Sequence, residues 1–310
     1  MEADKDIIII GAGPAGLTAA QYSARGNLRT LLIEEMASGG QVLLINDLEN
    51  YPGFKDPVNG MQLSQDMEEQ AIKFGAEITN ANVKKVTKID GLFHIETDSG
   101  NFTSYAVIAA TGARHKKLDI KGEQEFSGKG VSYCATCDGP FFKNKKILVI
   151  GGGDAACDEA TYLSKLTDKV VMIHRKDRFR AQKSLAERVE NNKNIEIRFN
   201  TECREIKGSA KVEKAVLETK DGKIYEEDFD AVFIFIGSIP QTQVLPDVPM
   251  DEAGFVIADC NMETAVKGLF VAGDVRATPF RQIIVACGDG AIASHSASLL
   301  IDELKGQKYK

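Results

Sequence analysis

The fold is decided by the stretch Ile7-Ile8-Ile9-Ile10-Gly11-Ala12-Gly13-Pro14-Ala15-Gly16, close to the amino terminus. Its β-branched run is typical of a strand that is buried on both faces. The glycines that follow have separate physical roles. Gly11 permits a tight turn, Gly13 lets backbone N–H groups approach a pyrophosphate, and Gly16 lets a helix pack close to the strand.

The residues after this stretch complete a βαβ unit. A helix is predicted over Leu17–Arg25, and a second strand over Thr30–Ile33 ends at Glu34. Glu34 lies 21 residues after Gly13, where an acid can accept hydrogen bonds from an adenosine ribose. Because strand, helix, second strand and acid are all present, we predict a dinucleotide site. The alternative is a glycine-rich turn with no ligand.

The same pattern returns later in the chain. Ile147–Ile150 predicts a strand, and Gly151-Gly152-Gly153-Asp154-Ala155-Ala156 follows it; adding 140 to the first unit's numbers aligns the two without a gap. A helix and the strand Val170–Ile173 come next. Short strands follow each unit and end at Ala110-Thr111-Gly112 and at Ile236-Gly237. The chain therefore contains two similar nucleotide-binding modules.

The two modules differ where the second strand ends. Glu34 aligns with His174, which opens the basic run His174-Arg175-Lys176-Asp177-Arg178-Phe179-Arg180. An acid suits a ribose 2′-OH, whereas a 2′-phosphate binds cationic donors. The first module is therefore expected to bind FAD or NAD and the second NADP(H), through Arg175, Lys176 and Arg180. The alternative is a solvated surface run, which Arg178 could simply join.

Two of the six cysteines, Cys134 and Cys137, lie close together. In a reducing compartment such a pair is more often catalytic or metal-binding than a structural staple. A two-residue spacer can bring the Cα atoms within disulfide range. A zinc module needs four ligands, and no second CxxC or paired His occurs, so no metal is expected. The other cysteines are expected to be buried small hydrophobes: Cys157, Cys203, Cys260 and Cys287.

Composition restricts the remaining possibilities. A chain of 310 residues favours two domains. The net charge of −7 argues against a nucleic-acid surface. No apolar run approaches the roughly 18 residues of a membrane span, and Ile7–Ile10 is too short for a signal-peptide core. We therefore expect a cytoplasmic protein that binds neither nucleic acid nor membrane.

The motifs above occur together with Gly273-Asp274 and Arg281-Gln282. In the order and spacing of these motifs, the whole chain resembles the low-molecular-weight, bacterial-type thioredoxin reductases. The resemblance implies an α/β fold of two Rossmann-like (three-layer ββα) dinucleotide-binding domains, with an NADPH domain inserted into a discontinuous FAD domain. We place the FAD domain at 1–115 and 244–310 and the NADPH domain, with the CxxC pair, at 116–243. The resemblance also implies a homodimer with one FAD per subunit.

The expected cofactor contacts combine the motifs with this resemblance. Those for FAD are Gly11, Gly13, Pro14, Ala15, Gly16, Glu34, Gly39, Gly40, Gln41, Asn50, Val83, Ala110, Thr111, Gly112, Gly273, Asp274, Arg281, Gln282 and Ile283. Those for NADPH are Gly151, Gly153, Asp154, Ala155, His174, Arg175, Lys176, Arg180, Ile236 and Gly237.

The resemblance implies electron flow from NADPH through flavin to a Cys134–Cys137 disulfide and then to the disulfide of thioredoxin. It assigns Cys137 as the sulfur that faces flavin and Cys134 as the one that attacks the partner. Asp138 is a proton donor and acceptor, or equally a helix N-cap or turn residue. Phe141 and Phe142 are expected in the core, with a partner-docking patch as the alternative.

Both the nicotinamide site and the cysteine pair belong to the inserted domain, and both must reach one flavin. We therefore predict that this domain rotates, with hinges at 113–117 and 237–245. Rival interpretations are another flavoprotein reductase on the same scaffold, which would lack the cysteine pair, and the reductase half of an alkyl hydroperoxide system, which would carry a further N-terminal region. A non-catalytic FAD-binding regulator would leave the cysteines unexplained.

Overall fold

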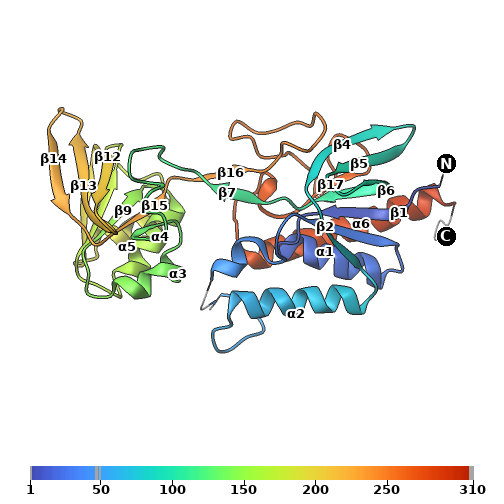
Figure 1. The fold of residues 1–310 in the computed structure, drawn as a ribbon, viewed down its shortest axis with the longest axis horizontal. Coiled ribbons are helices and arrows are strands. Elements are labelled where there is room, and N and C mark those ends of the chain that lie inside the picture. The colour runs from blue at the N-terminus through green and yellow to red at the C-terminus, as the bar shows by residue number, and fades with distance from the viewer. Residues whose placement is uncertain (1, 46–47, 49, 307–310) are drawn as a thin grey trace. The chain divides into compact units, whose positions relative to one another are not determined.

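The structure, a computed structural model, describes residues 2–45, 48 and 50–306, with the side chains of Leu44 and Cys137 outside the description. The chain divides into two compact units (Figure 1). Unit 1 is Met1–Arg114 with Ile239–Lys310, and unit 2 is His115–Ser238. The chain passes between the units in β7 (Ala113–His115) and β16 (Ser238–Pro240), which pair as a two-stranded sheet.

Unit 1 is built on a seven-stranded sheet with the order β3-β2-β1-β6-β5-β4 and with β17 paired to β6. Strands β1, β2, β3, β6 and β17 run parallel, whereas β4 and β5 extend the sheet beyond β6 in antiparallel pairs. The strands are β1 (Lys5–Ile10), β2 (Thr30–Glu34), β3 (Glu77–Asn80), β4 (Val83–Ile89), β5 (Leu92–Thr97), β6 (Asn101–Ala109) and β17 (Leu269–Val271).

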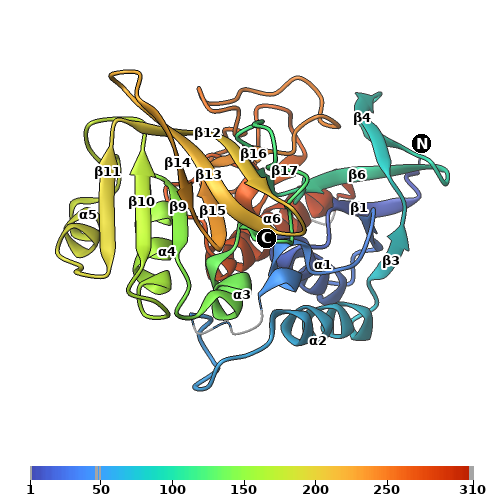
Figure 2. The same cartoon turned by 60° about the vertical axis from the view of Figure 1, so that its left-hand side comes forward.

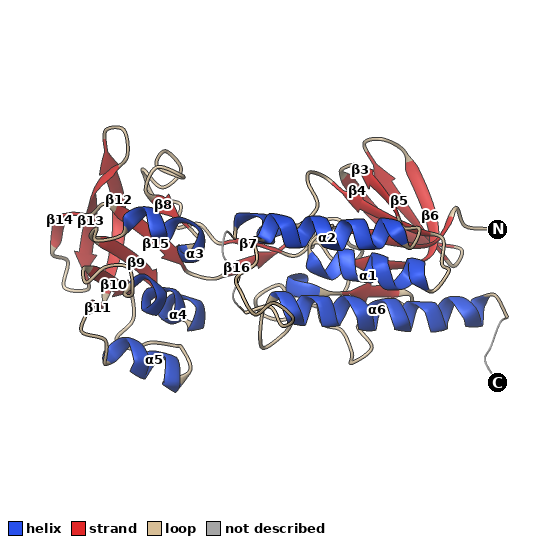
Figure 3. Cartoon of the chain, turned by 90° about the horizontal axis from the view of Figure 1, so that it is seen from below, coloured by secondary structure: helices blue, strands red, loops and turns tan. Residues whose placement is uncertain are grey.

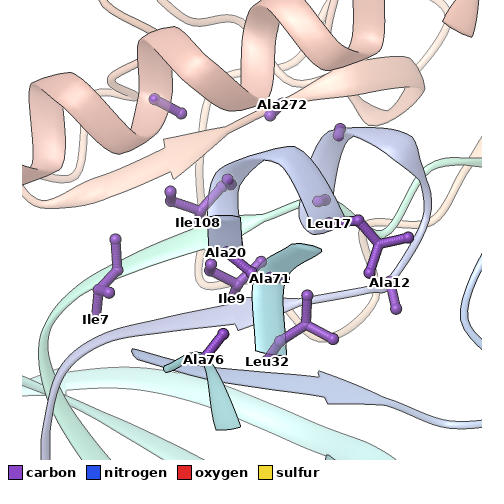
Figure 4. Packing of buried hydrophobic residues seen from close by; sticks show 14 of the residues in the cluster. Ile7, Ile9, Ala12, Leu17, Ala20, Leu32, Ala71, Ala76, Ile108 and Ala272 are labelled. Atoms are coloured by element: carbon purple, nitrogen blue, oxygen red, sulfur yellow. The ribbon is translucent and has the colours of Figure 1, made fainter. Parts of the chain in front are cut away.

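Three helices cover one face of this sheet (Figure 3). They are α1 (Pro14–Arg25), α2 (Gly60–Lys73) and α6 (Ile283–Leu304). The isoleucine run of β1 alternates between the two faces, as strand geometry requires. Ile7 and Ile9 pack with the helices (Figure 4), and Ile8 and Ile10 pack on the opposite face with Phe93 of β5. The parallel strands are therefore buried on both sides.

Unit 2 repeats this plan with a five-stranded parallel sheet of order β11-β10-β9-β15-β8. Helices pack on one side and an antiparallel sheet of order β12-β13-β14 on the other (Figure 2). The strands are β8 (Val131–Ser132), β9 (Ile147–Gly151), β10 (Val170–His174), β11 (Ile195–Phe199), β12 (Thr201–Gly208), β13 (Val212–Thr219), β14 (Ile224–Asp228) and β15 (Ala231–Phe235). The helices are α3 (Ala135–Asp138), α4 (Asp154–Leu163) and α5 (Lys183–Glu190).

The short 3-10 helices lie at turns: η1 (Gly40–Leu44), η2 (Gly139–Phe142) and η3 (Gly273–Val275). The predicted α/β class with three-layer, Rossmann-like units is confirmed. Helix α1 begins at Pro14, earlier than the predicted Leu17, because proline needs no N–H partner in the first turn. The unit boundary after Ser238 precedes the sequence-based one after residue 243, since Gln241 N–H donates to Gly112 O of unit 1 at 3.0 Å.

Helix α6 differs from the sequence analysis in one respect. Within the described part of the chain it is the one helix long and apolar enough, by length and composition, to cross a membrane. The sequence has no uninterrupted apolar run of this length here, because Asp289 lies among the apolar residues of α6. Ala286, Ala293, Ala297 and Ile301 of α6 are buried in the cluster that contains α1. This helix is thus a core element of unit 1.

Candidate active site

The parallel strands of unit 1 end together at one edge of the sheet. Ile10, the last residue of β1, is level with Ala109 of β6, which is level with Val271 of β17. The chain continues from these strands into Gly11, into Ala110-Thr111-Gly112 and into Gly273. The carboxyl edge of such a sheet is where ligands bind in α/β folds. Residues predicted from three distant motifs therefore meet at one edge.

The glycine turn of unit 1 is shaped for a phosphate group. A Cβ on Gly11 would lie 2.5 Å from Ala110 O, and one on Gly16 would lie 1.8 Å from Gly11 O. A Cβ on Gly13 would meet no atom within 4 Å, so this position faces open space at the start of α1. The first N–H groups of a helix are unpaired donors that attract anions. The turn therefore fits a pyrophosphate beside Gly13.

Glu34 ends β2 beside this turn. Its Oε2 accepts from Ala12 N–H at 2.7 Å, and its Oε1 accepts from Met36 N–H at 3.1 Å. The two backbone donors fix the carboxylate at the edge of the glycine turn. Each carboxylate oxygen keeps a further lone pair. Glu34 is thus held where an adenosine ribose would be expected.

The other end of the expected cofactor site contains Asp274 and Arg281. Burial raises the pKa of the Asp274 carboxyl. The charge of Arg281 acts against this rise, and the charge of Asp289 adds to it. The guanidinium of Arg281 stacks 3.8 Å from the ring centroid of Phe255. Its buried Nε has no hydrogen-bond partner among the described residues. A buried donor without a partner is costly unless a ligand supplies one. This orphan donor fits a bound polar group.

Further predicted residues of unit 1 contact one another. Asn50 Nδ2–H donates to Gln282 Oε1 at 2.9 Å, which brings together two residues that only the resemblance suggested. Gln41 donates from Nε2 to Ala113 O, and Gly39 N–H donates to Ala12 O at 2.7 Å. The rest lie at the same strand ends or helix starts: Pro14 and Ala15 in α1, Gly40 in η1, Val83 in β4 and Ile283 in α6.

Sequence reasoning missed the pair that supports Gly273. Asp289 of α6 accepts from Gly273 N–H at 3.1 Å, and also from Arg276 Nε at 2.6 Å and Nη2 at 2.9 Å. Asp289 is buried. Two charges that are 13 positions apart give no local signal, although an aspartate within a run of small apolar residues hints at a buried partner.

The glycine turn of unit 2 repeats the geometry of the first. A Cβ on Gly151 would lie 2.4 Å from Phe235 O, and one on Gly153 would meet no atom within 4 Å. Gly152, absent from the predicted set, is also constrained, because a Cβ there would lie 2.4 Å from His174 Nδ1. The open position again stands at the start of a helix, α4. This turn therefore also fits a dinucleotide.

The basic run after β10 surrounds this second turn. Arg175, Lys176 and Arg180 are exposed, and among the described residues none of them forms an ion pair. Arg180 N–H donates to Gly152 O at 2.7 Å, which ties the run to the glycine turn. Cationic side chains without an ion-pair partner, close to the glycine turn of unit 2, fit a bound phosphate group.

Two neighbouring residues have other contacts. His174 is buried with no partner for Nε2 among the described residues, and burial, then Arg180, Arg175 and Lys176, lower its pKa. Asp154 Oδ1 accepts from Gln182 N–H at 2.7 Å, and its Oδ2 accepts from Gln182 Nε2 at 2.9 Å. Asp154 therefore joins α4 to the start of α5. Ala155 follows it in α4, and Ile236 and Gly237 follow β15.

The cysteine motif starts at the same sheet edge of unit 2. Strand β8 pairs with β15, which pairs with β9, so Cys134 follows at the carboxyl edge that also carries Gly151. Cys134 is half-buried and disulfide-bonded. Ser132 Oγ accepts from Cys134 N–H and donates to Cys134 O, both at 3.1 Å. The predicted pairing with Cys137 falls on a side chain outside the described part of the structure.

A second support for the motif, also missed from the sequence, is Glu123. This buried residue accepts from Tyr133 Oη–H at 2.7 Å and from the N–H groups of Leu118 and Asp119 at 2.9 and 2.7 Å. Tyr133 immediately precedes Cys134. The loop at residues 118–119 and the cysteine motif are therefore anchored to one carboxylate.

The residues after the cysteines separate into two environments. Asp138 stands at the N-cap position of η2, but its side chain makes no capping hydrogen bond. Phe142 packs edge to face on Phe233, with ring centroids 6.0 Å apart, in the helix-side core of unit 2. Phe141 is 76% exposed, so the expectation of core packing is wrong for this residue. Among the described side chains, no group of three or more His, Cys, Asp or Glu could hold a metal ion.

Comparison with known proteins gives the family. The family model for pyridine nucleotide-disulphide oxidoreductases matches residues 5–290. A thioredoxin reductase of Treponema pallidum is 54% identical over 306 residues, which cover 98% of this chain and 100% of the relative. One of Listeria innocua is 44% identical over 97% of this chain and 95% of the relative. A crystal structure of Lactococcus lactis thioredoxin reductase superposes with a TM-score of 0.83 at 40% identity, covering 97% of this chain and 100% of that one.

Two dinucleotide turns, one in each unit, and a disulfide-bonded cysteine at the sheet edge of unit 2 define a flavin- and pyridine nucleotide-dependent disulfide oxidoreductase. The chain belongs to the pyridine nucleotide-disulphide oxidoreductase family and, within it, to the thioredoxin reductases. The resemblance stated from the sequence motifs is thereby confirmed.

Proposed function

We propose that the chain is a thioredoxin-disulfide reductase that uses NADPH and FAD and passes electrons through a Cys134–Cys137 disulfide. The observation that carries the proposal is the position of Cys134. It is disulfide-bonded and half-buried, and it follows the sheet edge that also carries the second glycine turn. A redox centre needs this accessibility, whereas a structural disulfide does not.

Unit 1 would hold FAD. Glu34 would bind the adenosine ribose, the α1 start at Gly13 the pyrophosphate, and Asp274 with Arg281 the remaining polar chain. Unit 2 would hold NADPH at Gly153, with Arg175, Lys176 and Arg180 on the 2′-phosphate. When bound, these groups supply the hydride and electron transfer, and the protein positions them.

The protein's own residues carry the exchange with the partner. The Cys134 thiolate attacks one sulfur of the thioredoxin disulfide, so that this S–S bond breaks and a mixed disulfide forms. Cys137 then displaces the partner, which leaves as a dithiol while the Cys134–Cys137 disulfide forms again. Asp138 accepts and returns the proton. In sum, NADPH, one proton and the thioredoxin disulfide give NADP⁺ and the dithiol.

Thermodynamics sets a requirement on this pair. Thioredoxin has a potential of about −270 mV, so the pair must be comparably reducing. We also propose that the protein acts in the cytoplasm as a homodimer, without nucleic acid or membrane. The net charge of −7 supports the absence of a nucleic-acid surface.

The direct test supplies the purified flavoprotein with NADPH and oxidised thioredoxin, and counts thiols against NADPH consumed. We expect two thiols for each NADPH, as the balance above requires. If NADPH reduces the flavin and an artificial acceptor but forms no thiols in thioredoxin, the chain is a different flavoprotein reductase.

A further inference from the structure

Helix α4 carries a buried carboxyl that the proposed mechanism does not use. One oxygen of Glu159, Oε2, is buried and has no hydrogen-bond partner among the described residues. The carboxyl accepts a hydrogen bond from the backbone N–H of Ala135. Ala135 is fully buried and is the first residue of α3, directly after Cys134. Glu159 therefore touches the turn that carries the cysteine motif.

The packing around this contact is tight. Ala135 lies in one hydrophobic cluster with Ala156, Cys157 and Ala160 of α4, and these side chains are closed to solvent. A carboxylate beside such a cluster is poorly hydrated, so burial disfavours its charged form. An apolar residue would fill this place at no such cost. A carboxyl at this place can accept the hydrogen bond from Ala135 N–H, which an apolar residue could not do.

The protonation state of Glu159 is adjustable near neutral pH. Burial, followed by the neighbouring charge of Asp158, raises the pKa of Glu159 to about 7, and the Ala135 N–H opposes this. Asp158 is itself exposed and lies 3.8 Å from Arg188 Nη1. Such a carboxyl gains or loses its proton in the same pH range in which the redox centre would exchange thiols and disulfides.

Few other charged groups lie on the elements packed around α4. Strands β9 and β15, which are described throughout, carry none. Besides Glu159, the titratable and charged residues with described side chains on α4, α3, α5 and β10 are Asp154, Cys157, Asp158, Tyr162, Asp138, Lys183, Glu187, Arg188, Glu190 and His174. Of these, Asp158 is the one with a resolved effect on Glu159.

We propose that Glu159 is a positioning residue for the redox centre: it holds the first turn of α3 through Ala135, and its charge is linked to that of Cys134. The inference rests on the proposed redox role of Cys134. Reduction of the disulfide by NADPH adds two electrons and leaves sulfurs that must be protonated or charged. A neutral Glu159 tolerates a thiolate at Cys134, whereas an ionised one repels it and favours the thiol.

The linkage predicts a distinctive pH profile. As pH rises through about 7, Glu159 ionises and the Cys134 thiol becomes harder to deprotonate. One unit of pKa corresponds to about a tenfold change in the thiolate fraction. We therefore expect Glu159→Gln, which keeps the acceptor for Ala135 N–H but carries no charge, to speed alkylation of reduced Cys134 by about 3- to 10-fold at pH 8. At pH 6 the two proteins should react alike.

The experiment uses the reduced holoprotein, iodoacetamide and mass spectrometry to follow Cys134 between pH 5.5 and 8.5. Asp158→Asn is the matched control, since it removes a charge from the adjacent, exposed position. In Asp158→Asn, the inflection near pH 7 that Glu159 causes in the alkylation rate of Cys134 should shift slightly but remain. Loss of the inflection in Glu159→Gln alone supports the proposal. Superimposed profiles for Glu159→Gln and the wild type would overturn it.

A second measurement does not depend on the cysteines. The folded pKa of Glu159 is raised to about 7 from 4.5, so its stabilising contribution is present below about pH 4.5 and is lost as pH rises through about 7. The melting temperature of the wild type should therefore fall across this window more than that of Glu159→Gln. Equal slopes would refute the raised pKa. If Cys134 cannot be reduced and alkylated in any variant, the proposed function is contradicted. If the slopes of melting temperature against pH nevertheless differ, the raised pKa of Glu159 is supported.

Discussion

At the scale of single residues, the glycines of the two turns show what the fold requires of each position. Gly11 and Gly151 are needed because the end of a neighbouring strand lies against them, at Ala110 O and Phe235 O. Gly13 and Gly153 have free space instead. The first pair is therefore required by the packing of the fold, whereas the second pair leaves space in which the proposed cofactors would bind, although one motif contains both.

This difference predicts opposite outcomes for two substitutions in unit 1. Gly16→Ala places a Cβ 1.8 Å from Gly11 O and should destabilise the protein by about 1–3 kcal/mol or more. Gly13→Ala meets no atom within 4 Å at an ordinary φ of −72°, so it should leave the apoprotein's stability unchanged and reduce bound flavin. Urea unfolding of the apoprotein and flavin absorbance after reconstitution measure the two effects. Equal stability losses would contradict the assignment.

The basic run gives a second prediction at this scale. Arg175→Ala removes the proposed charged donor to the 2′-phosphate, and a hydrogen bond of this kind is worth about 1.5–3 kcal/mol. The substitution should therefore raise the KM for NADPH about tenfold or more. The KM for NADH should hardly change, because NADH lacks that phosphate. Steady-state kinetics with both nucleotides measure this, with Arg178→Ala as the control on the same exposed run. Equal changes for the two nucleotides would show that Arg175 does not read the phosphate.

At the scale of elements, a segment close to each glycine turn is held by a partner from elsewhere in the chain. In unit 1, Asp289 of α6 binds Gly273 N–H and Arg276, and so fixes η3 against α6. In unit 2, Asp154 of α4 binds Gln182 at the start of α5. The loops proposed to contact the cofactors are thus fixed by side-chain hydrogen bonds within each unit.

The pair in unit 1 should be costly to break. Asp289→Ala leaves the guanidinium of Arg276 in a mostly buried place without its partner, and such losses amount to about 3–5 kcal/mol. Glu187→Ala, which removes the exposed pair with Lys183, should cost only about 0.5 kcal/mol. Urea unfolding compares the two variants. Similar small losses would mean that the buried pair does not hold η3 in place.

At the scale of the whole molecule, the chain is two units of one plan, in which an inner parallel sheet is covered by helices on one face and by antiparallel strands on the other. That plan could be predicted from sequence, because the isoleucine strand, the glycines and Glu34 are local signals with fixed spacing. The contacts of Asp289, of Glu123 and of Glu159 could not, because each joins residues through tertiary packing. Phe141 and Phe142 are alike in sequence, and only packing separates them.

Assembly gives a prediction at this scale. We expect sedimentation equilibrium of the flavoprotein to give twice the chain mass of 33.7 kDa, because the proposed function includes a homodimer. A single species at the chain mass would contradict that part of the proposal. It would leave the site within each subunit unaffected.

The central claim is that electrons leave the protein through the cysteine pair. The most direct measurement follows flavin absorbance and thioredoxin thiols together when NADPH is added to Cys137→Ser. The account predicts that the flavin is reduced and that no thiols form. Cys260→Ser should behave as the wild type, because this free cysteine is exposed, whereas the sequence-based expectation of a buried position is wrong for it. Continued formation of thioredoxin thiols by Cys137→Ser would contradict the account.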